Sequence, residues 1–384
     1  MGKEIQIPVG STLGMIAGGQ IGGFFTEAAL RMGYKVAVWD PDKAAPAKRF
    51  ASIPLTGSFD DPDVLNKFQK AVSGVSIEWE NVPSNLIKGL EKHVIVRPGS
   101  RSLELAQDRI KEKTFLEGNN FPITPFYPIQ ELSQISEIDF DFPWIIKTAT
   151  LGYDGHGQWY VANQVDIDTT SSLQNTMVPM VVEKVVKYKR ELSVVIVIDE
   201  EANCISYPPT ENLHQGGILK MSISPARITD DIKQKAIKLG RNVIQAIGDS
   251  GVFCVEMFQT QDDELLVNEI APRPHNSGHH TIDAFSISQY EHQVRVLAGL
   301  PLREPVMLSK SVLLNVLGDE YTVLSKDEQL YRVLDSMDAK IYLYGKTSVR
   351  PGRKMGHIMF CGDSLDELLG QADYCQSILA PEDI

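Results

Sequence analysis

Several features are scarce in this 384-residue chain, and each scarcity narrows the possible functions. Only four cysteines occur, and they are scattered without a metal-binding spacing, so a structural zinc site is not expected. No apolar stretch is long enough to span a bilayer, and residues 1–10 lack the apolar core of a signal peptide. Few cysteines, no membrane span and no leader together favour the reducing cytoplasm as the location.

An excess of positive charge is also absent. The chain has 37 Lys and Arg against 50 Asp and Glu, which gives a formal net charge of -13. An acidic chain without a basic stripe argues against nucleic acid or an acidic membrane surface as the main partner. An anionic small molecule is still possible, because it needs only a local pocket of Lys and Arg.

The order of predicted elements indicates an α/β protein of two or three domains. Residues 12–39 have the pattern of a strand, a glycine turn, a helix and a second strand, which is a βαβ unit. Apolar spacing predicts helices at 103–117, 231–247 and 286–297, and strands at 252–258 and 265–270. From residue 306 we expect short strands and turns, with a closing helix at 365–377.

A glycine-rich loop, GYDGHGQ at 152–158, is the most informative motif. It follows an apolar run that ends in Lys147. Three glycines leave a loop whose backbone N–H groups can approach an anion closely, and Lys147 can meet phosphate oxygens as a point charge. This pattern is typical of a nucleoside triphosphate site, although it is not a P-loop. The alternative is a surface hairpin turn.

A second glycine turn, at 18–23, follows the first predicted strand. With Asp40 closing the second strand, it is similar to a dinucleotide fingerprint, but the order GGQIGG differs from that fingerprint. The backbone N–H groups at this helix start could equally hold a monophosphate.

Two acids interrupt apolar strands, Glu256 in 252–258 and Glu269 in 265–270. A carboxylate inside a strand is costly unless it is paired or bound to a metal. Two carboxylates from one hairpin, with added phosphate oxygens, are ligands that Mg²⁺ prefers. The alternative is that each acid pairs with a Lys or Arg across the sheet.

Three further segments carry polar chemistry. The loop APRPHNSGHH at 271–280 concentrates Arg, His, Asn and Ser directly after Glu269, which suggests either a substrate site or a solvated connection. Residues 344–354 hold four cations, which favours phosphate capture or a solvated basic hairpin. The backbone at 184–186 could pair with an adenine, and Glu191 could accept from ribose hydroxyls.

Taken in order, these motifs resemble the ATP-grasp superfamily and, within it, the 5-(carboxyamino)imidazole ribonucleotide synthase family of purine biosynthesis. The resemblance covers nearly the whole chain. It depends on GGQIG at 18–22, EWENVP at 78–83, GYDGHGQ at 152–158, NLHQ at 212–215, NEIAPRPHNSGH at 268–279 and RPGRKMGH at 350–357. The chain departs from the common ATP-grasp pattern at Ala271, where many members have Asn, and at His156, where Arg is common.

The resemblance implies an ATP-grasp fold in three parts. These are a Rossmann-like pre-ATP-grasp domain at 1–103, an ATP-grasp region at 104–300 with a lid at about 120–188, and a small β-rich domain at 301–384. It also implies the roles of individual residues. ATP would be surrounded by Arg109, Lys147, Gly152, Tyr153, Asp154, Gly155, His156, Gly157, Gln158, Glu183, Lys184, Val185, Val186, Glu191, His214, Asn268 and Glu269. Mg²⁺ would be held by Glu256 and Glu269. Catalysis would involve Arg273, His275 and Asp154. Substrate would be bound by Gln20, Glu78, Asn276, Ser277, Lys346 and Arg353.

The implied reaction is an ATP-dependent ligation of bicarbonate to 5-aminoimidazole ribonucleotide through carboxyphosphate, with ATP and Mg²⁺ required, in a protein expected to form a homodimer. Two other functions stay open at this point. A related ligase that uses formate and glycinamide ribonucleotide would share the ATP machinery. A nicotinamide-dependent dehydrogenase would depend on residues 18–23 and Asp40 alone, and a non-catalytic nucleotide sensor is weaker still.

Overall fold

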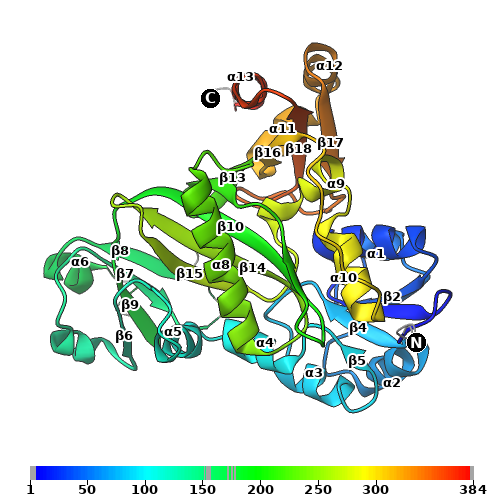
Figure 1. The fold of residues 1–384 in the computed structure, drawn as a ribbon, viewed down its shortest axis with the longest axis horizontal. Coiled ribbons are helices and arrows are strands. Elements are labelled where there is room, and N and C mark those ends of the chain that lie inside the picture. The colour runs from blue at the N-terminus through cyan, green and yellow to red at the C-terminus, as the bar shows by residue number, and fades with distance from the viewer. Residues whose placement is uncertain are drawn as a thin grey trace.

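The computed structural model describes residues 6–150, 152, 157–170, 173, 176 and 179–380. Three sheets organise this part of the chain (Figure 1). One is parallel and N-terminal, one is a large mainly antiparallel sheet, and one is a small antiparallel sheet at the left of Figure 1. The α/β and ATP-grasp-like arrangement predicted above is confirmed in this outline.

The N-terminal sheet has the strand order β3-β2-β1-β4-β5 and is parallel throughout. Its elements are β1 (Thr12–Ile16), α1 (Gln20–Arg31), β2 (Lys35–Asp40), η1 (Pro46–Arg49), β3 (Ile53–Thr56), α2 (Pro62–Ala71), β4 (Gly74–Ile77), α3 (Ser84–Leu90) and β5 (Ile95–Val96). The predicted βαβ unit is therefore confirmed. Helix α1 begins at Gln20, inside the glycine turn.

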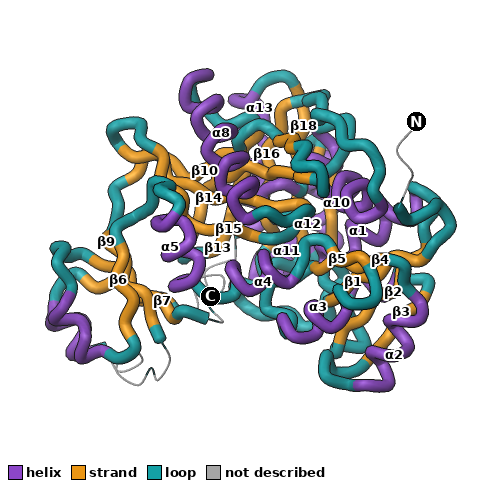
Figure 2. Tube along the Cα trace, turned by 60° about the horizontal axis from the view of Figure 1, so that its bottom comes forward, coloured by secondary structure: helices purple, strands orange, loops and turns teal. Residues whose placement is uncertain are grey.

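The single helix predicted at 103–117 is two helices, α4 (Ser100–Ala106) and α5 (Arg109–Gly118). The break has a local cause. The Asp108 carboxylate accepts hydrogen bonds from the backbone N–H groups of Ile110 and Lys111, at 3.0 and 3.3 Å, which starts a new helix. Helix α5 thereby acquires its own direction, and it lies between the small sheet and the large sheet (Figure 2).

The small sheet has the order β6-β9-β7-β8, with antiparallel pairs. Its elements are β6 (Phe126–Ile129), η2 (Leu132–Glu137), β7 (Trp144–Thr148), β8 (Gln158–Val161), α6 (Gln164–Thr169) and β9 (Met180–Lys184). It buries an apolar cluster of its own, which includes Trp144, Ile146, Val161 and Val182. A separate core lets this unit pack as an independent layer beside the large sheet.

The large sheet has nine strands in the order β15-β14-β10-β12-β13-β16-β18-β17, with β11 paired to β10. Its strands are β10 (Tyr188–Ile198), β11 (Cys204–Ser206), β12 (Thr210–Gln215), β13 (Ile218–Ser224), β14 (Gly251–Thr260), β15 (Leu265–Ala271), β16 (Lys310–Val316), β17 (Ala339–Leu343) and β18 (Gly356–Gly362). The C-terminal strands thus extend the central sheet, because β16 pairs directly with β13.

Helices cover this sheet at several places. Helix α8 (Asp230–Ile247) packs on one face, and α10 (Gln289–Ala298) lies between the sheet and helix α1 (Figure 1). The other helical elements are η3 (Asn276–Gly278), α9 (Thr281–Ala284), α11 (Gly318–Leu324), α12 (Asp327–Ser336) and α13 (Leu365–Leu379). The closing helix is confirmed as α13, whereas α11 and α12 were expected to be turns. In the part of the chain that the structure describes, no helix combines the length and apolarity needed to cross a membrane.

Candidate active site

Glu256 and Glu269 lie directly opposite each other on the paired strands β14 and β15. Cross-strand partners of this kind have Cβ atoms about 5 Å apart. The neighbours of Glu256, Val255 and Met257, pack in the core beneath α8. Because side chains alternate along a strand, Glu256 points to the opposite face of the sheet. The structure therefore confirms that one hairpin brings the two acids together.

A β-bulge places Glu269 on the same face as Glu256. The pairing passes from Glu256–Glu269 to Met257–Val267, so Asn268 is an extra residue in β15. Val267 and Ile270 both pack in the core beneath α8, three residues apart instead of two. The bulge thus reverses the alternation of the strand and directs Glu269 away from that core.

Each acid contacts one cationic side chain. The Arg109 Nη1 atom lies 3.0 Å from Glu269 Oε2, and the His275 Nε2 atom lies 2.8 Å from Glu256 Oε1. Burial opposes ionisation of Glu256, but His275 outweighs it and lowers the pKa of this carboxyl to about 2. The ion-pair alternative is therefore present in the structure, and Glu256 is charged at neutral pH.

The same two carboxylates fit a divalent cation. The Glu269 side chain is 41% exposed, and each carboxylate has a second oxygen that the contacts above do not use. Mg²⁺ commonly binds one or two carboxylates together with substrate phosphates and water. Among the described residues, no cluster of three or more His, Cys, Asp and Glu side chains is arranged for a metal, so phosphate oxygens would have to complete this site.

Helix α5 contributes two further titratable side chains that no sequence motif indicated, Glu112 and Lys113. Both side chains are buried. The Glu112 Oε1 atom accepts a hydrogen bond of 2.6 Å from the Ile270 N–H, next to Glu269. Burial, with repulsion from Glu269, raises the pKa of Glu112 to about 8. The spacing of Arg109, Glu112 and Lys113 at one helical turn was the signal that could have revealed this charged face.

Lys147 and Glu183, predicted separately as ATP ligands, contact each other. Lys147 Nζ lies 3.0 Å from Glu183 Oε1, and Lys113 Nζ lies 3.4 Å from Glu183 Oε2. Burial lowers the pKa of Lys147, and the nearby Arg109 and Lys113 add to this effect against the attraction of Glu183. Lys147 and Lys113 thus share Glu183, while Arg109 pairs with Glu269, so this cluster has one cation more than its paired carboxylates, which favours an anion.

The Glu183 pair gives a prediction about acid stability. Burial opposes ionisation of Glu183, but Lys147 and Lys113 outweigh it and lower the pKa from 4.5 to about 2. A depressed carboxyl pKa stabilises the fold above pH 4.5, by about 3 kcal/mol here, and this contribution is lost as the pH falls toward 2. We expect Glu183→Gln to be less stable than wild type at neutral pH and to lose about 3 kcal/mol less unfolding free energy than wild type between pH 5 and 2.

Urea unfolding followed by circular dichroism at several pH values measures this effect. Glu117→Gln, on the exposed side of the same helix that carries Lys113, is the matched control and should retain the wild-type acid dependence. An unchanged pH profile in Glu183→Gln would contradict the ion-pair assignment.

The glycine-rich loop connects β7 and β8, as predicted. Lys147 pairs with Gln158 across these strands, and the Thr148 N–H donates to the Gly157 carbonyl at 2.9 Å. Gly157 has φ +69°, and a Cβ there would lie 2.6 Å from Thr148 Oγ1, so a larger residue would not fit. The structure also describes Gly152, whereas Tyr153, Asp154, Gly155 and His156 lie outside the described residues.

The residues predicted to hold adenine and ribose lie on β9, β10 and β12 and in the connection that follows β9. His214 Nδ1 is 2.5 Å from Glu191 Oε2, across the neighbouring strands β10 and β12. Burial lowers the pKa of His214, but Glu191 outweighs it and the net shift is upward. The Lys184 and Val185 N–H groups donate to the carbonyls of Pro125 and Pro143, so these two donors are used within the protein and not by adenine.

Arg273 and His275 project from the polar loop that follows β15. The Arg273 guanidinium makes a two-pronged ion pair with Glu80, with Nη2 3.1 Å from Glu80 Oε1. His275 Nδ1 contacts Ser277 Oγ at 2.8 Å, and this hydroxyl also contacts Ser193 Oγ at 2.8 Å. Ser277 is fully buried, which places its hydroxyl as a support for His275. Glu80 was quoted in a motif but given no role.

Two carboxylates of the protein itself fill the glycine turn at 18–23. The Gly18 N–H donates to Asp40 Oδ2 at 2.7 Å, and the N–H groups of Gly19 and Ile21 donate to Glu78. These N–H groups are therefore occupied by the protein's own carboxylates and are not available to a dinucleotide or a monophosphate. Burial raises the pKa of Glu78 to about 7, although the charge of Lys346 and these N–H donors oppose the rise. Gln20, the first residue of α1, lies in the chain between these two donors, Gly19 and Ile21.

The predicted ribonucleotide residues of the C-terminal part lie in ordered contacts. Asn276 exchanges amide hydrogen bonds with Asn315, at 3.2 and 2.5 Å. Lys346 Nζ donates to the Lys354 carbonyl at 2.8 Å, and Arg353 Nη1 donates to the Ser348 carbonyl at 2.6 Å. The C-terminal basic segment reaches the N-terminal domain, because the Tyr344 carbonyl accepts a 2.9 Å hydrogen bond from Arg49 Nη2.

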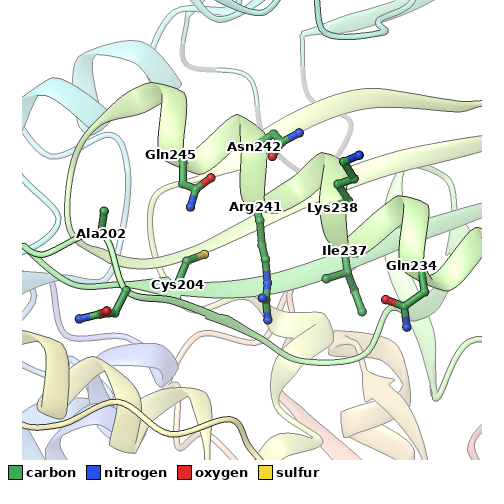
Figure 3. A pocket seen from close by; sticks show the side chains of 9 residues that line it. Ala202, Cys204, Gln234, Ile237, Lys238, Arg241, Asn242 and Gln245 are labelled. Atoms are coloured by element: carbon green, nitrogen blue, oxygen red, sulfur yellow. The ribbon is translucent and has the colours of Figure 1, made fainter.

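A surface cavity of about 540 Å³ lies elsewhere, between α8 and the β10–β11 turn (Figure 3). Arg241 and Lys238 line it together with amide side chains. Arg241 is already engaged by Ser206 and Glu304. The cavity is on the α8 face of the sheet, whereas the two acids point to the other face, so it is separate from the candidate site.

Three family models match consecutive parts of the chain. Residues 11–107 match the ribonucleotide synthetase preATP-grasp domain, and residues 114–290 match the ATP-grasp domain. Residues 311–371 match the phosphoribosylaminoimidazole carboxylase C-terminal domain. The chain thus combines the ATP-grasp machinery with two domains of purine ribonucleotide enzymes.

Similar proteins extend over the whole chain. N5-carboxyaminoimidazole ribonucleotide synthase of Bacillus subtilis (strain 168) is 35% identical over 369 residues, which is 96% of this chain and 95% of that protein. A crystal structure of an N5-carboxyaminoimidazole ribonucleotide synthetase with ADP has a TM-score of 0.92 and 35% identity, and covers 97% of this chain and 98% of that chain.

The Aspergillus clavatus enzyme, solved with ADP and 5-aminoimidazole ribonucleotide, has a TM-score of 0.88 and 29% identity, and covers 96% of this chain and 98% of that chain. The identity of 35% extends over nearly the full length of this chain and of the Bacillus subtilis protein. The paired acids, the cation cluster and the glycine-rich loop agree with the same assignment. The chain belongs to the N5-carboxyaminoimidazole ribonucleotide synthase family of ATP-grasp enzymes.

Proposed function

We propose that this chain catalyses the ATP-dependent carboxylation of 5-aminoimidazole ribonucleotide with bicarbonate, which gives 5-(carboxyamino)imidazole ribonucleotide, ADP and phosphate. The observation that carries this proposal is the convergence of Glu256 and Glu269 on one face of the sheet, beside the Arg109, Lys113 and Lys147 cations. This site suits a metal-bound triphosphate. Family membership supplies the substrates, since the Aspergillus clavatus relative was solved with ADP and 5-aminoimidazole ribonucleotide.

The nucleotide would lie between the small sheet and the large sheet. Lys147 and Arg109 would meet its phosphates, because both are cations at the ends of elements that face the paired acids. Glu191 would accept from the ribose hydroxyls, with His214 fixing its orientation. Adenine would pair with the backbone around Val186, since the N–H groups of Lys184 and Val185 are engaged within the fold. Glu256 and Glu269 would hold Mg²⁺, which neutralises charge on the phosphoryl group during transfer.

Bicarbonate would lie near Arg273 and His275. In the first step a bicarbonate oxygen bonds to the γ-phosphorus, and the bond to the β-phosphate oxygen breaks to release ADP. Arg273 is suited to hold the bicarbonate carboxylate, because Glu80 fixes its guanidinium plane. Burial opposes protonation of His275, but its contacts with Cys254 and Glu256 outweigh burial and raise the pKa of this imidazole to about 10. His275 is therefore a cation at neutral pH, suited to stabilising negative charge rather than accepting a proton.

In the second step the exocyclic amine attacks the carboxyphosphate carbon, or CO₂ released from it, so that a C–N bond forms and phosphate leaves. Carboxyphosphate hydrolyses readily, so water must be excluded. The ribonucleotide would be held by Lys346 and Arg353 at its phosphate, with Gln20 and Glu78 near the imidazole. Asn276, fixed by Asn315, would contribute a further contact.

The direct test is ADP release with each candidate substrate. Turnover that requires both bicarbonate and 5-aminoimidazole ribonucleotide supports the proposal. Turnover with formate and glycinamide ribonucleotide would instead show a formylating ligase, and nucleotide binding without turnover would show a sensor. The homodimer predicted above is a separate expectation, which light scattering of the purified protein tests.

Arg353→Ala is expected to raise the KM for the ribonucleotide by about tenfold or more. The reason is that losing a charge-assisted contact with the ribonucleotide phosphate costs about 1.5–3 kcal/mol of binding free energy. Because this contact is remote from the reacting amine, its loss should affect substrate binding more than the chemical step. The KM for ATP should stay near the wild-type value. Steady-state kinetics with each substrate varied in turn measure both constants, and weakened ATP binding with an unchanged ribonucleotide KM would contradict the placement.

A further inference from the structure

An arginine of the N-terminal domain reaches the basic segment of the C-terminal domain. Arg49 is the last residue of η1, and its Nη2 atom donates a 2.9 Å hydrogen bond to the Tyr344 carbonyl. The two residues are 295 positions apart in the chain. This contact joins the start of the segment that contains Lys346 to the N-terminal domain.

The guanidinium packs against a glycine that leaves room for it. Gly345 has φ +72°, and a Cβ there would lie 2.5 Å from Arg49 Cζ. Any other residue would be strained in this backbone conformation and would also displace Arg49. The turn between Tyr344 and Lys346 is therefore shaped around the arginine.

The Tyr344 side chain extends the same arrangement to Lys346. Its buried ring lies beneath the Lys346 ammonium, with Nζ 5.4 Å from the ring centroid. Its hydroxyl contacts His357 Nδ1 at 2.9 Å, and its N–H donates to the Met355 carbonyl at 3.0 Å. Contacts of its carbonyl, its N–H and its hydroxyl thus hold Tyr344 in place, and the packing of Lys346 on the Tyr344 ring makes the position of Lys346 depend on Tyr344.

The anchor of Arg49 also lies beside the proposed imidazole subsite. The Ala47 N–H, in the same short helix, donates to the Gly18 carbonyl at 2.8 Å. The next residue, Gly19, donates its N–H to Glu78. One short helix therefore connects the turn around Glu78 with the turn that carries Lys346.

We propose that Arg49 is a positioning residue that clamps the Tyr344–Lys346 turn to the N-terminal domain and so sets the place of Lys346 relative to Glu78. The inference rests on the proposed function, in which these two side chains bind opposite ends of one ribonucleotide. Arg49 itself need not touch the substrate. It fixes the distance between two subsites that belong to different domains.

Kinetics test this role. We expect Arg49→Ala to raise the ribonucleotide KM about tenfold, with the KM for ATP within twofold of wild type. Arg31→Ala is the matched control, because Arg31 is also exposed and acts on the same Glu27 carboxyl as Arg49, but belongs to α1. In a Lys346→Met background, Arg49→Ala should add no further increase, since it acts through Lys346. Arg49→Lys keeps the positive charge but lacks the planar guanidinium with its several N–H donors. A ribonucleotide KM equal to that of wild type in this variant would contradict the positioning role of Arg49.

Hydrogen exchange makes the test independent of catalysis. Exchange at residues 344–356 should be faster in Arg49→Ala than in wild type and unchanged in Arg31→Ala. Faster exchange in a protein whose ADP release ignores the ribonucleotide would contradict the proposed function and retain the clamp. Exchange equal to wild type, or equal increases in KM for both substrates, would overturn the clamp.

Discussion

Glu269→Gln is expected to lower ADP release by about a hundredfold to a thousandfold, which is typical of losing a preorganised electrostatic contact at the reacting phosphate. The substitution keeps the shape of the side chain but removes the charge that faces Glu256 across the strand pair. It also leaves Arg109 without its 3.0 Å carboxylate partner. Two effects at one position, a weaker Mg²⁺ site and a displaced cation, make this the most damaging single change that we expect.

Glu264→Gln is the control for this substitution. Glu264 is exposed at the turn between β14 and β15, so the same chemical change occurs in the same hairpin away from the paired acids. Its ADP release should equal that of wild type. Near-normal turnover in Glu269→Gln, at a saturating Mg²⁺ concentration and with an unchanged melting temperature, would contradict the metal assignment.

The alternation of apolar and polar residues could predict that the two acids share a hairpin, but it could not predict their common face. In the sequence, Val267 and Glu269 are two residues apart and should lie on one side of the strand. The bulge at Asn268 reverses that expectation, and a bulge depends on the pairing of two strands rather than on local preference. A pattern read along one strand cannot contain this information.

The glycine turn at 18–23 was ambiguous for a similar reason. Its N–H donors were recognised, but the groups that accept from them, Asp40 and Glu78, lie in later strands or just after them. Only the strand order β2-β1-β4 brings both carboxylates beside the turn. The helix start therefore binds the protein's own acids, which the sequence could not distinguish from an anionic ligand.

Lys113 and Arg49 show a different limit. Neither residue lies in a motif, and a lone lysine on a helix or an exposed arginine is most often a solvated charge. Lys113 becomes a candidate site residue because Asp108 caps α5, which begins at Arg109 and directs Lys113 toward Glu183. Arg49 becomes informative only through Tyr344, nearly 300 residues later. Such roles arise from tertiary contacts, so a motif search passes over them.

Arg273→Lys is expected to reduce bicarbonate-dependent ADP release by about a hundredfold, although the charge is retained. The Arg273 guanidinium is held in one plane by its two contacts with Glu80, and its remaining donors are thereby oriented. A lysine ammonium is a point charge that cannot reproduce a forked pair. The KM for ATP should change little, because Arg273 is not among the proposed nucleotide contacts.

Arg227→Lys provides a control with the same geometry. Arg227 makes an equivalent forked pair with Glu211, at 3.0 and 2.7 Å, next to helix α8 on the other face of the large sheet. If forked pairs matter only for stability, both variants should lose a similar unfolding free energy and both should remain active. We expect instead that Arg227→Lys keeps wild-type turnover while Arg273→Lys loses it. Equal turnover in the two variants, measured with bicarbonate varied, would show that Arg273 has no part in holding bicarbonate.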